Sequence, residues 1–168
     1  MSRWRPPTPS AAPYITAAGY RALELELERL AARRVETVRH LAAAAAEGDR
    51  SENAEYLYRK KELREIDRRL GYLQRRMPNL TIVAHVPATR DRVFFGAWVE
   101  LEDTDGKLTR HRIVGGDEIG QGQAYISVDA PLAQALLKRG LDDQIVIMTP
   151  RGEVRYTLLD ITYEHASD

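Results

Sequence analysis

Two acidic side chains are the strongest candidates for chemistry in this sequence. Asp49 and Glu52 lie three residues apart, between two segments that have the periodicity of helices. At this spacing both carboxylates lie on the same side of a helical turn. Two carboxylates supply only part of the roughly six oxygen ligands that Mg²⁺ prefers. The pair is therefore suited to completing a metal shell that another active site offers, and we expect the free protein to bind no metal.

The same two residues also have a purely structural interpretation. Asp-x-x-Glu is a capping-box pattern, in which Asp49 is the N-cap of a helix and Glu52 is its third residue. Acidic residues in the first turn also complement the helix dipole. The spacing alone favours the cap, but a capped turn would also hold the carboxylates in place, so both interpretations stay open.

Long helices are predicted on both sides of the acidic pair. The first, at about 17–47, has Thr16 as a candidate N-cap and apolar residues at helical spacing: Tyr20, Leu23, Leu27 and Leu30. The second, at about 50–77, ends at Pro78 and has a heptad-like stripe: Leu63, Ile66, Leu70, Leu73 and Met77. Helices joined by so short a link are antiparallel neighbours. The first half therefore predicts an antiparallel α-helical coiled-coil hairpin.

Basic residues recur along the second predicted helix. They are Arg59, Lys60, Lys61, Arg64, Arg68 and Arg69. Several follow one another at a spacing of four, so one helix face can be strongly basic. The alternative is a solvated face whose charge is balanced through i,i+4 pairs by Glu62, Glu65 and Asp67. No aromatic residues interleave with the arginines, so we predict no readout of nucleic-acid bases.

The second half of the chain predicts a small α+β domain. Strands are expected at about 93–101, 111–114, 125–128, 144–148 and 154–161, with Asp105-Gly106 as a hairpin turn. A short helix is expected at 131–138, closed by Gly140. One helix against several antiparallel strands gives the α+β class. We divide the chain into a disordered N-terminal extension at 1–13, the coiled-coil domain at 14–84 and the β domain at 85–168.

Composition excludes several classes of protein. The chain has 168 residues and no cysteine, which rules out disulfides and cysteine-based zinc sites. The four histidines show no metal-ligand spacing. No apolar run reaches the roughly 18 residues of a membrane span, and the proline-rich N-terminus lacks the apolar region of a signal peptide. We therefore expect a cytoplasmic protein with no membrane contact.

The run from Gly48 to Tyr56, GDRSENAEY, resembles the signature loop of the Gre transcript-cleavage factors, and its Arg50-Ser51 step is similar to the GreB type. Further blocks resemble the family in the same order along the chain: 14–16, 19–20, 60–69, 93–99, 112–115 and 125–129. The resemblance covers about residues 14–164. It implies that the β domain is FKBP-like in fold.

The resemblance also implies a function. Members of the family are transcription elongation factors that enter the secondary channel of bacterial RNA polymerase and rescue arrested complexes by stimulating cleavage of backtracked nascent RNA. Asp49 and Glu52 match the family's acidic pair, which helps to bind Mg²⁺ in trans at the polymerase active site, as in two-metal chemistry. The protein would thus be a catalytic accessory, with no small-molecule substrate and no enzyme activity of its own.

Other residues receive roles from the same resemblance. Ser51 and Asn53 would support the loop, and the basic face would contact the 3′ segment of the nascent RNA without sequence specificity. The segment Asp129-Ala130-Pro131-Leu132 would dock on a coiled coil at the rim of the polymerase. By residue type alone, this segment is a helix N-cap followed by proline.

The sequence departs from the family's pattern at two informative places. The family's first helix usually carries an Arg-Pro step; Arg33-Arg34-Val35 lies near that place, in a stretch about one residue shorter than usual. Leu132 stands where methionine is common. Two other functions stay open. A non-catalytic regulator would occupy the same channel without needing the acidic pair, and a prolyl isomerase would need only the β domain. The aromatic residues of that domain are more typical of a core than of an isomerase pocket.

Overall fold

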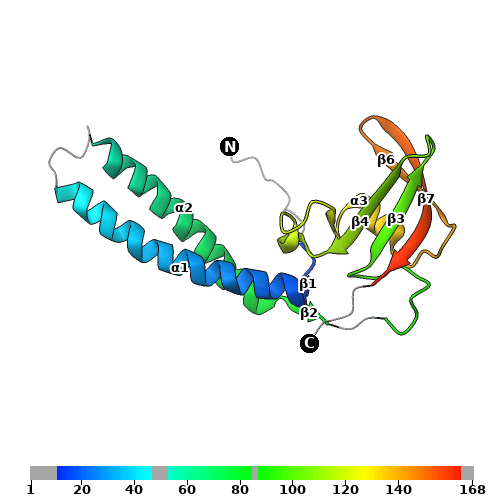
Figure 1. The fold of residues 1–168 in the computed structure, drawn as a ribbon, viewed down its shortest axis with the longest axis horizontal. Coiled ribbons are helices and arrows are strands. Elements are labelled where there is room, and N and C mark those ends of the chain that lie inside the picture. Colours follow the sequence, from blue (N-terminus) through cyan, green and yellow to red (C-terminus); the bar gives the residue numbers. More distant parts are fainter. Residues whose placement is uncertain (1–10, 47–52, 85–86, 164–168) are drawn as a thin grey trace, which may run out of the picture. The chain divides into compact units, whose positions relative to one another are not determined.

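The computed structural model describes residues 11–46, 53–84 and 87–163, and the chain divides into two compact units. One unit comprises residues 20–80 and is helical. The other combines the residues up to Gly19 with those from Thr81 onward, and is built on β-sheet (Figure 1).

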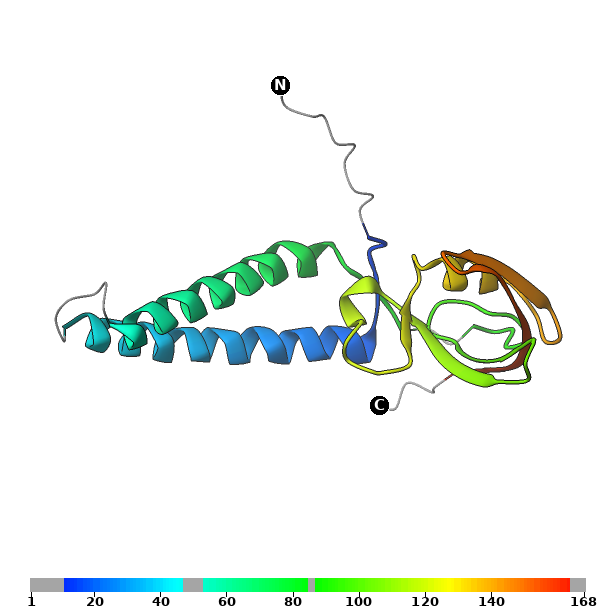
Figure 2. The ribbon, with the colours of Figure 1, turned by 90° about the horizontal axis from the view of Figure 1, so that it is seen from above.

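The helical unit is an antiparallel hairpin, as the sequence predicted. Helix α1 spans Ala17–Ala46 and helix α2 spans Ala54–Arg76, followed by the short helix η1 at Met77–Asn79. Figures 1 and 2 show α1 and α2 lying side by side. The N-cap of α1 is confirmed, because the backbone N–H of Gly19 donates a 2.9 Å hydrogen bond to the Thr16 hydroxyl.

The apolar contact of the hairpin is uneven along its length. The apolar residues with buried side chains are Leu23, Ala44, Ile66, Leu70, Leu73 and Met77. Four of these belong to the predicted stripe of the second helix. By contrast, Val35 and Val38 of α1 and Leu57 of α2 are exposed. Apolar packing therefore stabilises mainly the half of the hairpin that contains the C-terminal turns of α2.

The β unit contains a five-stranded sheet in the order β5-β4-β3-β7-β6. The strands are β3 (Trp98–Asp103), β4 (Leu108–Val114), β5 (Tyr125–Ser127), β6 (Gln144–Thr149) and β7 (Gly152–Thr162). The short helix η2 (Gly116–Glu118) follows β4, and α3 (Pro131–Leu136) follows β5. A separate parallel pair joins β1 (Tyr14–Thr16) to β2 (Thr81–Val83).

The core of this unit lies between the sheet and α3. Its fully buried side chains include Val93, Leu101, Ile113, Leu136 and Leu158. Among the aromatic residues, Phe95, Tyr156 and Tyr163 pack against this core. The hydroxyl of Tyr163 donates to the carbonyl of Arg92 at 2.6 Å and accepts the backbone N–H of Phe94 at 2.9 Å. These aromatic side chains therefore serve packing, as the sequence suggested.

Three sequence predictions in this unit were wrong in detail. The sheet is mixed, because β5 pairs with β4 in parallel after the chain crosses over through η2. The strand expected from residue 93 begins at Trp98, since Val93 instead exchanges backbone hydrogen bonds with Lys138 and Arg139. The helix expected to reach residue 138 ends at Leu136, and Lys138 adopts a φ of 69°. The α+β class is confirmed, and the FKBP-like topology stays a prediction.

His111 on β4 gives a prediction about pH. Burial lowers the pKa of this half-buried imidazole below its ordinary value of 6.5. The unfolded chain therefore binds a proton at a higher pH than the folded chain does, and His111 makes the folded state less stable as the pH falls below about 6.5. Urea unfolding between about pH 8 and pH 5 should show a smaller loss of stability in His111→Gln than in the unsubstituted protein. Parallel curves for the two proteins would contradict this assignment.

Candidate functional site

Asn53 joins the two helices where the hairpin turns. It is the N-cap of α2, with an extended backbone, and its side-chain oxygen accepts the backbone N–H of Tyr56 at 3.0 Å. Its side-chain amide donates to the carbonyl of Ala44 in α1 at 2.9 Å. One side chain thus satisfies a backbone group from each helix and connects the last turn of α1 to the first turn of α2.

The capping prediction for the acidic pair needs correction. Helix α2 begins at Ala54, so the N-cap role expected of Asp49 belongs to Asn53. The residues Asp49, Ser51 and Glu52 themselves lie outside the described residues. The start of α2 at Ala54 is therefore capped by Asn53. The roles of Asp49 and Glu52 themselves stay a prediction.

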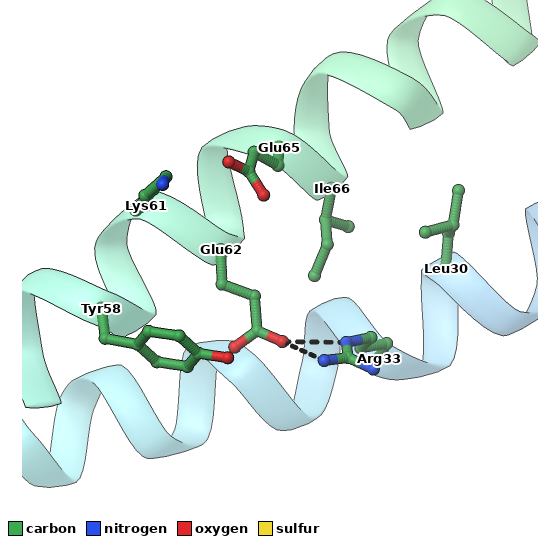
Figure 3. A pocket seen from close by; sticks show the side chains of 7 residues that line it. All are labelled: Leu30, Arg33, Tyr58, Lys61, Glu62, Glu65 and Ile66. Carbon is green, nitrogen blue, oxygen red and sulfur yellow. Dashed lines mark hydrogen bonds and ion pairs between the residues drawn. The ribbon is translucent and has the colours of Figure 1, made fainter.

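Ion pairs connect the two helices near the middle of the hairpin. The Arg33 guanidinium of α1 donates to the Glu62 carboxylate of α2, at 2.8 Å from its Nε atom. Glu62 also accepts from Arg59 at 3.0 Å, and Arg34 donates to Asp67 at 2.6 Å. In Figure 3, Arg33 faces Glu62 across the space between the helices, beside Leu30 and Ile66.

These pairs give the Arg33-Arg34 step a structural role that the sequence did not reveal. The hydrogen bond from Arg33 lowers the pKa of Glu62 and keeps this carboxylate charged. Ile66 is buried beside these pairs, so the charged contacts add to apolar packing in holding the helices together there. A proline after the arginine could not supply the second of the two ion pairs.

The pairs also determine which basic side chains of α2 remain available. Arg59 is bound to Glu55 and Glu62, and Arg69 donates to Glu26 of α1 at 2.7 and 2.8 Å. The other four of the six candidates are exposed, and among the described residues no carboxylate forms an ion pair with them. We call these four the basic strip: Lys60, Lys61, Arg64 and Arg68.

The charge balance predicted as the alternative for this helix is therefore incomplete. Glu62 and Asp67 bind arginines of α1, and Glu62 also binds Arg59. These carboxylates do not neutralise the basic strip by direct contact. Lys60 does contact the ring of Tyr56, with its amine 5.7 Å from the ring centroid, which leaves its positive charge in place.

The predicted docking segment lies at the start of α3. The side chain of Asp129 accepts the backbone N–H of Ala12 at 2.8 Å, and Ala130 is the N-cap of the helix without a side-chain hydrogen bond. Asp129 and Pro131 are exposed, whereas Leu132 packs partly against the core. The interpretation of this segment as a helix N-cap followed by proline is therefore confirmed, with Ala130 as the N-cap and Pro131 as the first helical residue. The exposed face of the segment consists of Asp129 and Pro131.

The described residues offer no metal site of their own. Within 11–46, 53–84 and 87–163, no three His, Cys, Asp or Glu side chains gather closely enough to hold an ion. None of the helices in this part of the chain has the length and hydropathy needed to cross a bilayer. The candidate site thus consists of the acidic pair, the Asn53 junction and the basic strip, all on the hairpin.

Comparison with known proteins identifies the family. Residues 13–82 match the model of the N-terminal domain of transcription elongation factors, and residues 88–163 match that of the GreA/GreB C-terminal domain. This chain belongs to the GreA/GreB family of transcription elongation factors. The resemblance inferred from the loop motif and the collinear blocks is therefore confirmed.

Relatives match the chain over nearly its whole length. It is 52% identical to transcription elongation factor GreB of Xanthomonas axonopodis pv. citri, over 97% of this chain and 98% of that protein. It is 48% identical to GreB of Pseudomonas aeruginosa, over 99% of both chains. Among solved structures, the GreA factor homolog Gfh1 of Thermus thermophilus is 25% identical, with a TM-score of 0.40, over 89% of this chain and 97% of that one.

Proposed function

We propose that this member of the GreA/GreB family binds RNA polymerase through its secondary channel and stimulates the polymerase's own cleavage of backtracked nascent RNA. The observation that carries the proposal is the position of Asp49 and Glu52 in the short segment 47–52, between helix ends that Asn53 joins. A helical hairpin can carry two carboxylates into a narrow opening. The chain would then act as a catalytic accessory.

The chemistry proposed for the acidic pair is that of a shared metal shell. Mg²⁺ at the polymerase active site would take oxygen ligands from Asp49 and Glu52 together with water and RNA phosphate oxygens. A metal held in this way would supply water activation for hydrolysis of the RNA phosphodiester. In this proposal the carboxylates hold the metal, and the polymerase supplies the remainder of the active site.

The proposal is tested by adding the purified protein to halted, backtracked elongation complexes. We expect faster release of a 3′ RNA fragment, followed by renewed elongation from the shortened transcript. If the protein instead blocks elongation without releasing a fragment, it is a non-catalytic regulator that occupies the same channel. If residues 85–168 alone catalyse prolyl isomerisation and the whole protein has no effect on the halted complexes, both functions that use the channel fail.

We further propose that the basic strip contacts the displaced 3′ segment of the RNA. Replacing Lys60, Arg64 and Arg68 by glutamine removes three exposed charges that no described carboxylate binds. For single-stranded nucleic acid, each phosphate contact contributes about 0.7 to the magnitude of the slope of log affinity against log salt. The loss of three contacts should therefore reduce the magnitude of this slope by about 2. The half-saturating concentration for cleavage, measured at several salt concentrations, gives this slope.

A matched control removes the same charge elsewhere on the hairpin. Arg21, Arg29 and Arg39 are exposed residues of α1, so their replacement by glutamine also changes the net charge by three. This control should keep the original slope. Equal slopes for the two triple variants would show that only the overall charge of the hairpin matters, and the strip would lose its assigned role.

Finally, we propose that the exposed face of Asp129 and Pro131 contacts the rim of the polymerase. Pro131 is the first residue of α3 and Asp129 precedes the N-cap Ala130, and the Ala12 hydrogen bond holds the Asp129 carboxylate in place. The segment therefore presents a fixed charge beside a rigid ring, which is the kind of pre-ordered surface that loses little entropy on binding.

A further inference from the structure

A buried carboxylate lies at the root of α1, and sequence analysis gave no sign of it. Glu118, the last residue of η2, is only 1% exposed. Its side chain accepts the backbone N–H of Gly115 at 2.8 Å and the backbone N–H of Thr16 at 3.1 Å. It also accepts the hydroxyl of Thr16. Hydrogen bonds to an ionised carboxylate are stronger than neutral ones, and a buried carboxylate requires such donors.

The donors belong to the place where β1 passes into α1. Thr16 is the last residue of β1, and its hydroxyl also accepts the N–H of Gly19 in the first turn of α1. A continuous chain of hydrogen bonds therefore runs from the first turn of α1 through Thr16 to Glu118. All of these residues belong to the β unit, so the helix starts inside that unit.

The surrounding backbone is shaped to admit this carboxylate. A Cβ atom at Gly19 would lie 2.1 Å from Oε1 of Glu118, and a Cβ atom at Gly115 would lie 2.0 Å from the carbonyl oxygen of Tyr14. Both distances are far shorter than van der Waals contact. Glycine at these two positions allows β1 and the start of α1 to approach Glu118 closely, as in other sites where backbone segments meet.

We propose that Glu118 is a positioning residue for transcript cleavage, because it fixes the root of α1 on the β unit. This inference rests on the proposed function. The docking segment belongs to the β unit and the acidic pair to the hairpin, so delivery of the pair is intramolecular once docking has occurred. A first turn of α1 held by Glu118 leaves fewer conformations to the chain between the two contacts. Such coupling raises the effective concentration of the second contact without adding a new one.

The test compares Glu118→Gln with Glu102→Gln, a matched change at a partly exposed glutamate of β3. The glutamine side chain at position 118 is neutral and keeps only one acceptor oxygen, so the three donors lose an ionised partner. We expect the half-saturating concentration for cleavage to rise about tenfold in Glu118→Gln, with the maximal rate within about twofold, since the loss falls on coupling rather than on the chemistry. Glu102→Gln should match the unsubstituted protein in both quantities.

A second pair of variants leaves Glu118 intact. Thr16→Val removes the hydroxyl that links the helix to the carboxylate, whereas Thr16→Ser retains it. Hydrogen exchange of residues 14–20, measured on the protein alone, should be faster in Thr16→Val and in Glu118→Gln and near normal in Thr16→Ser. The half-saturating concentration should follow the same order.

The outcomes separate this inference from the proposed function. If Glu118→Gln lowers the maximal rate with an unchanged half-saturating concentration, or leaves both unchanged, the positioning role is overturned. Unchanged hydrogen exchange in both Glu118→Gln and Thr16→Val overturns it as well, whatever the cleavage result. If the unsubstituted protein does not stimulate cleavage, the proposed function fails and the positioning role fails with it, while faster exchange would still show that Glu118 holds the helix root.

Discussion

The double replacement Asp49→Asn/Glu52→Gln is expected to reduce stimulated RNA cleavage at saturating protein by on the order of 100-fold or more. Groups that merely orient metal ligands contribute about 10- to 100-fold to affinity or activity, and ligands themselves should contribute at least as much. Neutral amides keep the size of the side chains but bind Mg²⁺ poorly compared with carboxylates. The measurement is the rate of 3′ fragment release from backtracked complexes.

Binding to polymerase should be little changed in the same variant. The N-cap of α2 is Asn53, which also ties α2 to Ala44, so the ends of the helices do not depend on the charges at positions 49 and 52. Competition with the unsubstituted protein for polymerase measures this binding, and circular dichroism measures the helix content. Undiminished cleavage by the variant would exclude a metal-ligand role. Binding without cleavage by either protein would instead favour the non-catalytic regulator.

Truncation of Leu73 should produce the largest loss of stability in the hairpin. This side chain of α2 is fully buried, in the half of the hairpin where apolar packing is concentrated. Leu73→Ala removes apolar contacts and leaves a cavity, which costs about 2 to 5 kcal/mol in a well-packed core. Urea unfolding followed by circular dichroism reports mainly on α1 and α2, because they contain most of the helical residues in the described part of the chain.

Leu57 provides the matched control for this prediction. It is a leucine of the same helix, but it is 50% exposed. Leu57→Ala should change the free energy of unfolding by no more than about 0.5 kcal/mol, as is usual for surface positions. Similar losses for the two variants would mean that packing is spread evenly along the hairpin. The ion pairs of Arg33 and Arg34 would then be less important than their position suggests.

Much of the architecture follows from local patterns in the sequence. The heptad-like spacing of Leu63 to Met77 predicted α2 and its buried face, because side chains three and four residues apart share one side of a helix. Asp105-Gly106 predicted the β3–β4 hairpin, where Gly106 adopts a φ of 76° that few other residues tolerate. The loop motif at 48–56, together with its collinear blocks, was sufficient to identify the family.

The sequence by itself determined the helices, most strands, the family and the position of the acidic pair, because each of these depends on residues close together in the chain. Only the tertiary structure decided the N-cap at Asn53, the parallel pairing of β4 with β5, the division of the basic residues into paired and exposed sets, and the Glu118 anchor. The Asn53 cap is a local contact with Tyr56, but the division of the basic residues and the Glu118 anchor depend on partners far apart in sequence, such as Arg33 with Glu62 and Thr16 with Glu118. Local periodicity does not predict which distant carboxylate a given donor binds, because that partner depends on how the helices and strands pack together.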